Sequence, residues 1–254
     1  MIRARFEKPE QVFAGCPDTV ILPLSALTKA DGSDGTALAA RFPQLAGKTV
    51  IAEIPAIIWP SHGKAVRTQL EGLAALGIKD VLTENLGAVA LAKEYGLTAH
   101  GGMYLNVMNT EALAQYRQLG LADVTLSFEL AFSQAGALAA ADTGFVTYGY
   151  LPLMKFRNCP AQGKNGCAGC SGRNELIDRK GEHFPIICRE RQYSELLNCV
   201  PLYVGDRRLP PVGFETLYFT TETREQCAAV YRQYVNREAP AFRRTAGLYF
   251  REVQ

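Results

Sequence analysis

Four of the seven cysteines in the chain fall within the segment 158–188. Seven, two and seventeen residues separate Cys159, Cys167, Cys170 and Cys188 from one another. The central C-x2-C pair can direct two thiolates at one ion, and four thiolates suit either a structural zinc or an iron–sulfur cluster. The spacing therefore predicts a metal site and leaves its metal open between these two.

The rest of the chain favours a metal over disulfides. No apolar run approaches the roughly 20 residues that span a bilayer, and the N-terminus lacks the apolar core of a signal peptide. We therefore expect a cytoplasmic protein without membrane insertion, in a compartment that keeps thiols reduced. Cys16, Cys199 and Cys227 are expected to pack as small apolar side chains, with Cys199 as a substitute ligand.

Charge is uneven along the chain. The formal net charge is only +2, which does not indicate nucleic-acid binding by the chain as a whole. The segment 154–191, however, carries eight basic and four acidic residues. This excess fits either a solvated surface loop or an anion-binding surface.

Strand and helix patterns alternate along the chain and must position these residues. Eight apolar, β-rich segments are predicted strands, at 3–6, 19–24, 49–59, 80–86, 98–107, 123–130, 144–154 and 214–221. Eight strands separated by helices predict a TIM-type (β/α)8 barrel within the usual ~250 residues. A doubly wound open sheet is the alternative, although no glycine-rich phosphate motif follows any strand.

Helical patterns occupy 64–78, 110–120 and 133–144. The segment 158–208 breaks the alternation, because it lacks a convincing crossover helix after the seventh strand. We therefore expect one barrel domain over 1–254, with 158–208 as a cysteine-rich, metal-binding insertion. Its position after a strand places it at the carboxyl face, where barrel enzymes carry their active sites.

Polar residues at the strand ends are the candidates for chemistry. Glu129 and Asn106 are predicted to orient the reacting group, while Arg157, Asn85 and Glu53 are predicted to bind substrate. Arginine suits an anionic co-substrate or a phosphate, because its planar fork donates two parallel hydrogen bonds. Helix capping is the competing interpretation for two further strand-end residues, Glu84 and Asn109.

Several blocks of the sequence resemble a known family. "YGYLPLMKFRNCP", "ELIDRKGEHFPIIC", "LLNCVPLYVGD" and "TAGLYFREV" are similar to the collagenase-like peptidase family U32, and further blocks extend the resemblance from Arg3 to Val253. The resemblance implies a TIM-type barrel and a 4Fe-4S cluster on Cys159, Cys167, Cys170 and Cys188. This chain departs from the family pattern at "GFVTYGYLPL", which lacks the glutamate that usually precedes the cysteines.

The resemblance also implies a function. Better-understood relatives are oxygen-independent hydroxylases of a tRNA or rRNA base or of a ubiquinone precursor, with prephenate as the oxygen source. The expected partners are thus RNA or a small aromatic substrate, and a second barrel of the same family in cis or in trans.

Two alternatives are a peptidase and a non-catalytic RNA-binding or assembly module. Proteolysis has little support in the sequence, since H-E-x-x-H and G-x-S-x-G motifs are absent and His183 and Cys188 form the only neighbouring histidine–cysteine pair.

Overall fold

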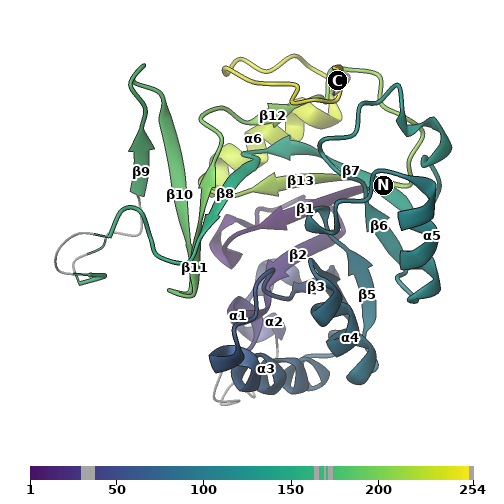
Figure 1. The fold of residues 1–254 in the computed structure, drawn as a ribbon, viewed down its shortest axis with the longest axis vertical. Helices are drawn as coiled ribbons and strands as arrows, with labels where there is room; N and C mark the ends of the chain where they lie inside the picture. The colour runs from purple at the N-terminus through teal and green to yellow at the C-terminus, as the bar shows by residue number, and fades with distance from the viewer. Residues whose placement is uncertain (30–37, 163–165, 169, 171–173, 252–254) are drawn as a thin grey trace.

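The computed structural model describes residues 1–29, 38–162, 166–168, 170 and 174–251. In this part of the chain, eight parallel strands close into a barrel, with the last strand paired to the first (Figure 1). In barrel order they are β1 (Ile2–Phe6), β2 (Thr19–Pro23), β3 (Thr49–Glu53), β4 (Asp80–Thr83), β5 (Thr98–Gly101), β6 (Asp123–Thr125), β7 (Thr143–Gly149) and β13 (Phe214–Phe219). The TIM-type barrel predicted from the sequence is confirmed.

Helices pack around the barrel. The described α-helices are α1 (Leu24–Leu27), α2 (Leu38–Arg41), α3 (Gly63–Ala75), α4 (Leu86–Glu94), α5 (Thr110–Gln118) and α6 (Arg224–Val235). Short 3-10 turns are η1 (Pro9–Gln11), η2 (Pro43–Leu45), η3 (Pro60–His62), η4 (Met103–Leu105) and η5 (Ala135–Ala137). Helix α3 buries Val66, Leu70 and Leu73 as its sequence pattern predicts. Within the described ranges, no helix has the length and apolar character needed to cross a membrane.

The helix predicted over 133–144 is wrong, because only η5 forms there. The C-terminal segment packs against this part of the barrel instead. The Phe132 N–H donates to the Tyr249 carbonyl at 2.8 Å, and the two rings stack with centroids 4.3 Å apart. Tyr249 is buried and its hydroxyl donates to the Val146 carbonyl of β7. Residues distant in sequence thus cover the surface on which we expected the helix.

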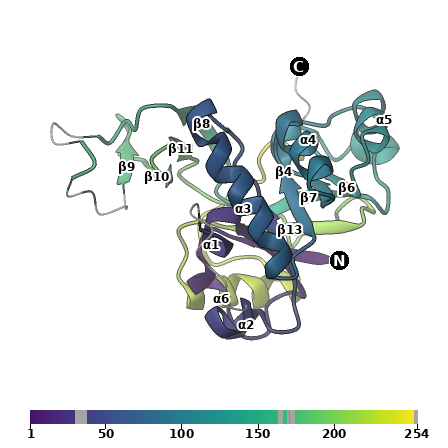
Figure 2. The ribbon, with the colours of Figure 1, turned by 90° about the horizontal axis from the view of Figure 1, so that it is seen from below.

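A second sheet projects from the carboxyl face of the barrel. The strands β8 (Pro152–Phe156), β11 (Tyr193–Leu197), β10 (His183–Arg189) and β9 (Asn174–Ile177) pair antiparallel in this order. Figures 1 and 2 both show β9 and the far end of β10 extending away from the barrel. A two-stranded pairing of β12 (Leu202–Tyr203) with β7 returns the chain to the barrel.

This sheet changes two sequence predictions. The single strand predicted over 144–154 is two strands, since the chain turns after Gly149, whose φ is +141°. A Cβ at Gly149 would lie 2.5 Å from the Tyr218 carbonyl oxygen, so a larger residue does not fit this close approach. The segment 158–208 indeed has no helix among its described residues, but it carries strands that the sequence did not predict.

Charged side chains fill much of the barrel interior. Successive side chains of a strand alternate between its faces, so Arg3 and Arg5 of β1 both point inward. Arg3 binds Asp123 near the amino ends of the strands, and Arg5 binds carboxylates near the carboxyl ends. Three buried apolar residues form a separate interior cluster, Ile21, Ile51 and Leu82. The interior therefore combines an apolar cluster with two buried ion-pair groups.

Candidate functional site

Arg5 forms the centre of an ionic network at the carboxyl mouth of the barrel. Its guanidinium donates two hydrogen bonds to Glu53, at 2.8 and 2.6 Å, and one to Glu84 at 3.0 Å. The Tyr104 backbone N–H donates to the second oxygen of Glu84 at 2.8 Å. Burial is costly for charges unless they are paired, and these pairs satisfy that requirement.

The β10–β11 hairpin adds Arg189 to this network. Arg189 donates to Glu195 at 2.8 and 2.6 Å, to Glu7 at 2.6 Å and to the Tyr218 hydroxyl. Tyr104 donates its hydroxyl hydrogen to Glu195 at 2.8 Å. The hairpin is therefore bound to the barrel mouth by a carboxylate just after β1 and by tyrosine hydroxyls from β13 and the turn after β5.

Lys155 of β8 joins the same network. Its ammonium lies 3.2 Å from the centroid of the Tyr104 ring and 3.6 Å from a Glu195 oxygen. These contacts combine a cation–π interaction with an ion pair. Both sheets thus contribute cations to the barrel mouth.

Burial and charge shift the pKa values of the carboxyl groups in opposite directions. Burial raises the pKa of Glu7 above its usual value although Arg189 opposes the shift, and burial likewise raises the pKa of Glu84 against the effect of Arg5. At Glu195 burial also acts upward, but Arg189 and Lys155 outweigh it and lower the pKa. When the pKa values of neighbouring carboxyl groups differ in this way, one group can donate a proton while another stays charged and stabilises positive charge.

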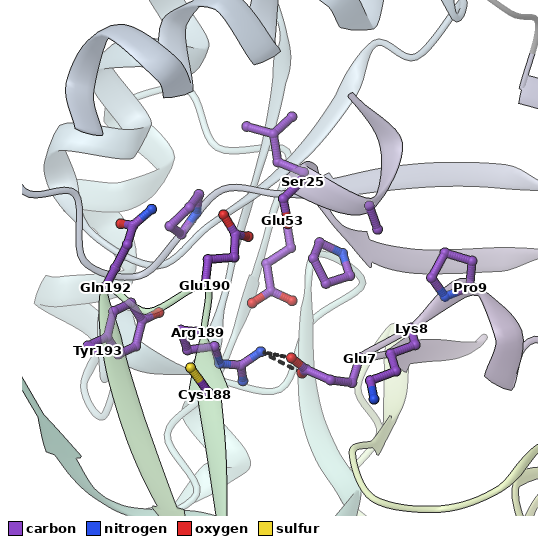
Figure 3. Close-up of a pocket in the computed structure, with 14 residues that line it drawn as sticks. Glu7, Lys8, Pro9, Ser25, Glu53, Cys188, Arg189, Glu190, Gln192 and Tyr193 are labelled. Carbon is purple, nitrogen blue, oxygen red and sulfur yellow. Dashed lines mark hydrogen bonds and ion pairs between the residues drawn. The ribbon is translucent and has the colours of Figure 1, made fainter. Parts of the chain in front are cut away.

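A cavity of about 230 Å³ opens onto this network. We call it the mouth cavity, and Figure 3 shows the carboxylate of Glu53 directed toward Glu7 and Arg189 across it. Glu190, Cys188 and other residues of the β10–β11 hairpin form part of its lining. The cavity therefore exposes three carboxylates, one guanidinium and one thiol to a bound molecule.

The hairpin turn beside the cavity has an unfavourable backbone. Glu190 and Arg191 have φ values of +53° and +62°, and the Gln192 N–H donates to the Arg189 carbonyl at 2.8 Å. Asn-Gly is the favoured pair in such a two-residue turn, and each bulkier residue there costs about 1–2 kcal/mol. Residues held in rare conformations cluster at functional sites, which supports a functional role for this turn.

A second, cationic groove adjoins the mouth cavity, and the side chain of Gln192 lines both. We call this space of about 490 Å³ the rim groove. It is lined by Trp59, Pro60, Ser61, His62, Arg157, Asn158, Arg191 and Gln192. The Arg157 guanidinium lies 4.8 Å from the Trp59 ring centroid. Among the described residues, no carboxylate pairs with Arg157 or Arg191, so the groove suits an anion.

The residues predicted from the sequence have different positions. Glu53 belongs to the ionic network and Arg157 to the rim groove. Asn85 caps helix α4, since its side chain accepts from the Ala88 N–H at 2.8 Å. Asn109 likewise caps α5, as the capping interpretation predicts, whereas Glu84 binds Arg5 and caps no helix.

Asn106 and Glu129 lie close together outside the mouth cavity. The Ser127 hydroxyl donates to the Asn106 side chain at 2.5 Å and accepts from the Glu129 backbone N–H at 3.1 Å. Both predicted residues are exposed. Both residues contact Ser127, and their role in orienting the reacting group remains a prediction.

The four cysteines do not form a common site in this arrangement. Cys167, Cys170 and Cys188 are exposed thiols, and Cys188 lines the mouth cavity. Among the described residues, no three His, Cys, Asp or Glu side chains lie close enough together to hold a metal ion. The donor positions thus do not fit an iron–sulfur cluster or a zinc ion without rearrangement, and the metal site remains a prediction from the sequence.

Four site residues were not predicted from the sequence, namely Arg5, Glu7, Arg189 and Glu195. A signal for two of them was present in "RARFE", where charged residues two positions apart face one side of a strand. An arginine inside a predicted barrel strand is costly unless it is paired. Arg189 and Glu195 carried no such signal, because the hairpin that positions them was not predicted.

Comparison with known protein families found a match for part of the chain. Residues 34–159, which extend from before β3 to just after β8, match the model of peptidase family U32. No curated protein and no solved structure matches the chain. By this match, the chain belongs to peptidase family U32.

Proposed function

We propose that this chain is an oxygen-independent hydroxylase whose reaction takes place in the mouth cavity. The observation that carries the proposal is the position of Glu7 and Glu53 beside Arg189, at the carboxyl ends of barrel strands. Barrel enzymes of this architecture use the same end of the barrel for catalysis. The proposed acceptor is an RNA base or a small aromatic molecule, as the sequence resemblance implies.

In this proposal the rim groove binds the co-substrate and the mouth cavity holds the reacting groups. Arg157 and Arg191 in the rim groove would bind the anionic part of a co-substrate, such as a carboxylate of a prephenate-like molecule. Glu7, with its raised pKa, can hold a proton closer to neutral pH than an ordinary glutamate. Glu53 would orient the reacting group, because its carboxylate is held by two hydrogen bonds from Arg5.

The cluster is a separate part of the proposal. A 4Fe-4S cluster on the four cysteines, with zinc as the alternative metal, would need the cysteine segment to draw together. None of the residue roles given above depends on such a cluster.

Proteolysis by a cysteine–histidine pair has no support in the geometry. His183 and Cys188 are five positions apart on β10, so their side chains point to opposite faces of the sheet. His183 pairs with Glu175 at 3.0 Å, and the Cys188 thiol accepts from the Arg191 N–H at 3.3 Å. These contacts leave the hydroxylase proposal ahead of the peptidase alternative.

Complementation of a strain that lacks the gene tests the proposal. Mass spectrometry of RNA nucleosides and of small aromatic metabolites would identify a hydroxylated product that disappears with the gene. Glu53→Gln should reduce that product about 100-fold or more, because the carboxylate loses its charge at almost constant volume. Glu94→Gln is the matched control, since this exposed carboxylate pairs with Arg67 away from the mouth cavity.

The Glu129→Gln variant tests which of two sites carries the reaction, the Asn106–Glu129 pair predicted from the sequence or the mouth cavity. Full activity of Glu129→Gln with loss in Glu53→Gln would support the mouth cavity, and the reverse would support the Asn106–Glu129 pair. A strain whose RNA and metabolites do not change on loss of the gene would favour the non-catalytic module.

A further inference from the structure

Glu222 is a half-buried carboxylate whose partners differ from those of the buried carboxylates of this protein. Glu53, Glu84, Glu195 and Asp123 each bind an arginine. Glu222 instead accepts two uncharged hydrogen bonds, from the Tyr148 hydroxyl and the Thr220 N–H, both at 2.6 Å. In the described part of the chain, no cationic side chain pairs with it. Carboxylates that are partly withdrawn from water gain from a charged partner, so Glu222 has capacity for a positively charged ligand.

Glu222 lines a pocket outside the barrel. This pocket of about 600 Å³, here called the α6 pocket, lies between α6, the carboxyl ends of β7 and β13, and the segment around Phe242. Its volume is within the range of small-molecule sites. It shares no lining residue with the mouth cavity or the rim groove. The α6 pocket is therefore a separate site.

Aromatic side chains form much of its wall. Tyr148, Tyr150 and Phe242 line the α6 pocket together with Glu222, and Val200, Pro201 and Val230 supply apolar surface. The Tyr148 and Phe242 rings meet edge to face with centroids 6.2 Å apart. Rings around a single carboxylate are the arrangement that binds organic ammonium groups, through cation–π attraction and a charge-assisted contact.

Two other polar groups of the pocket are compatible with this ligand. Arg243 lines the pocket, but its guanidinium is paired with Glu182 at 2.7 Å. Cys199 contributes a thiol to the lining of the α6 pocket. Among the described residues, no three metal-ligating side chains lie close together in this pocket. A metal ion therefore fits this donor set less well than an organic cation.

We propose that the α6 pocket binds a small organic ammonium compound, with Glu222 as its counter-ion and Tyr148, Tyr150 and Phe242 around the cationic group. Burial raises the pKa of Glu222, and a bound cation would lower it again. The site is independent of the hydroxylase proposal, because none of its lining residues lines the mouth cavity.

Phenethylammonium and the uncharged phenethyl alcohol form a matched pair of probes, whose binding to the full chain can be measured by calorimetry or saturation-transfer NMR. We expect the ammonium compound to bind and the alcohol to bind at least about tenfold more weakly. Glu222→Gln should remove most of this preference. Glu225→Gln is the control, because Glu225 lies three residues further on at the start of α6 and does not line the pocket.

Several results would overturn the proposal. They are equal binding of the two probes, unchanged binding in Glu222→Gln, or no binding at about 10 mM probe, since such affinity is weaker than a built site gives. If Glu222→Gln fails to fold, Phe242→Leu keeps the carboxylate and should weaken ammonium binding severalfold. Arg157→Gln should leave probe binding unchanged, so failure of the hydroxylase proposal and failure of this one can be told apart.

Discussion

Arg5 neutralises two carboxylates that water barely reaches. Its side chain and that of Glu84 are almost fully buried, and Glu53 is only slightly more accessible. Tyr218 adds a ring 4.2 Å from the guanidinium. Removing one member of such a group leaves its partners charged and unpaired, which costs more than the pair itself contributes.

We therefore expect Arg5→Met to lower the free energy of unfolding by about 3–5 kcal/mol, measured by urea denaturation. Arg117→Met is the control, because Arg117 pairs with Asp142 at the surface, with 45% and 35% of the two side chains exposed. This control should change stability little, since solvent screens exposed ion pairs. Equal effects of the two substitutions would contradict the role given to Arg5.

His100 makes stability depend on pH at the other end of the barrel. Burial acts to lower the pKa of His100, but hydrogen bonds to Asp123 at 2.8 Å and Asp80 at 3.1 Å outweigh it and raise the pKa. The folded state therefore holds the proton more tightly than the unfolded chain does. The stabilisation is complete below the unfolded pKa of about 6.5 and is lost as the pH rises through the raised folded pKa.

The prediction concerns the difference between wild type and His100→Gln. We expect the free energy of unfolding to differ most near pH 6 and to converge at alkaline pH, once the pH has risen above the folded pKa of His100. Urea denaturation at a series of pH values measures this difference. A difference that stays constant over the series would show that His100 does not bind its proton more tightly in the folded state.

Among the structural elements, the close approach of the ends of β4 and β5 positions Glu84 in the ionic network around Arg5. The Glu84 side chain, just after β4, passes over Gly102, just after β5. A Cβ at Gly102 would lie 2.3 Å from the Glu84 carboxyl carbon, which is far inside van der Waals contact. The glycine is therefore required for the carboxylate to reach Arg5.

Gly102→Ala should displace Glu84, lower the thermal unfolding midpoint and reduce any activity of the mouth cavity. Small-to-large changes in such a packed position cost about 1–3 kcal/mol. Gly63→Ala is the control, since a Cβ at Gly63 would meet nothing within 4 Å at the start of α3. Differential scanning calorimetry should show a lower midpoint for Gly102→Ala only. An unchanged midpoint would mean that Glu84 can move without loss.

At the scale of the whole molecule, the barrel and the projecting sheet differ in how they are held. Strands on both sides pair with each barrel strand, and the main hydrophobic core surrounds the barrel. The strands β8 and β9 are sheet edges with exposed Leu153, Met154, Leu176 and Ile177. The far part of the sheet thus has less buried apolar surface and should open more easily.

Cys167→Ser tests this difference together with the metal prediction. After anaerobic reconstitution, we expect about four irons per wild-type chain and a loss of iron in Cys167→Ser. The barrel should stay folded, so the far-ultraviolet circular dichroism should remain, while proteases should cut the cysteine segment faster. Stoichiometric zinc in place of iron would contradict the cluster, and global unfolding of the variant would contradict the independence of the barrel.

Local patterns in the sequence were sufficient to predict all eight barrel strands, and they offered helix capping as one of two interpretations of Asn109. Such features depend on residues within about one helical turn or one strand, which periodicity reports directly. The helix predicted over 133–144 failed for the opposite reason. Tyr249, more than a hundred residues away, packs against Phe132 in its place, and a local pattern contains no information on that contact.

Residue type and spacing alone were enough to predict the barrel, the face that carries the strand-end polar residues, and the concentration of four cysteines within the segment 158–188. Which charges meet could be learned only from the folded chain. Arg5 reaches Glu53 across 48 residues and Arg189 reaches Glu7 across 182. Closure of the barrel and insertion of a hairpin bring these groups together, and burial then requires that each find a partner. Glu222 is the exception, since the one arginine that lines its pocket among the described residues, Arg243, pairs with Glu182 instead.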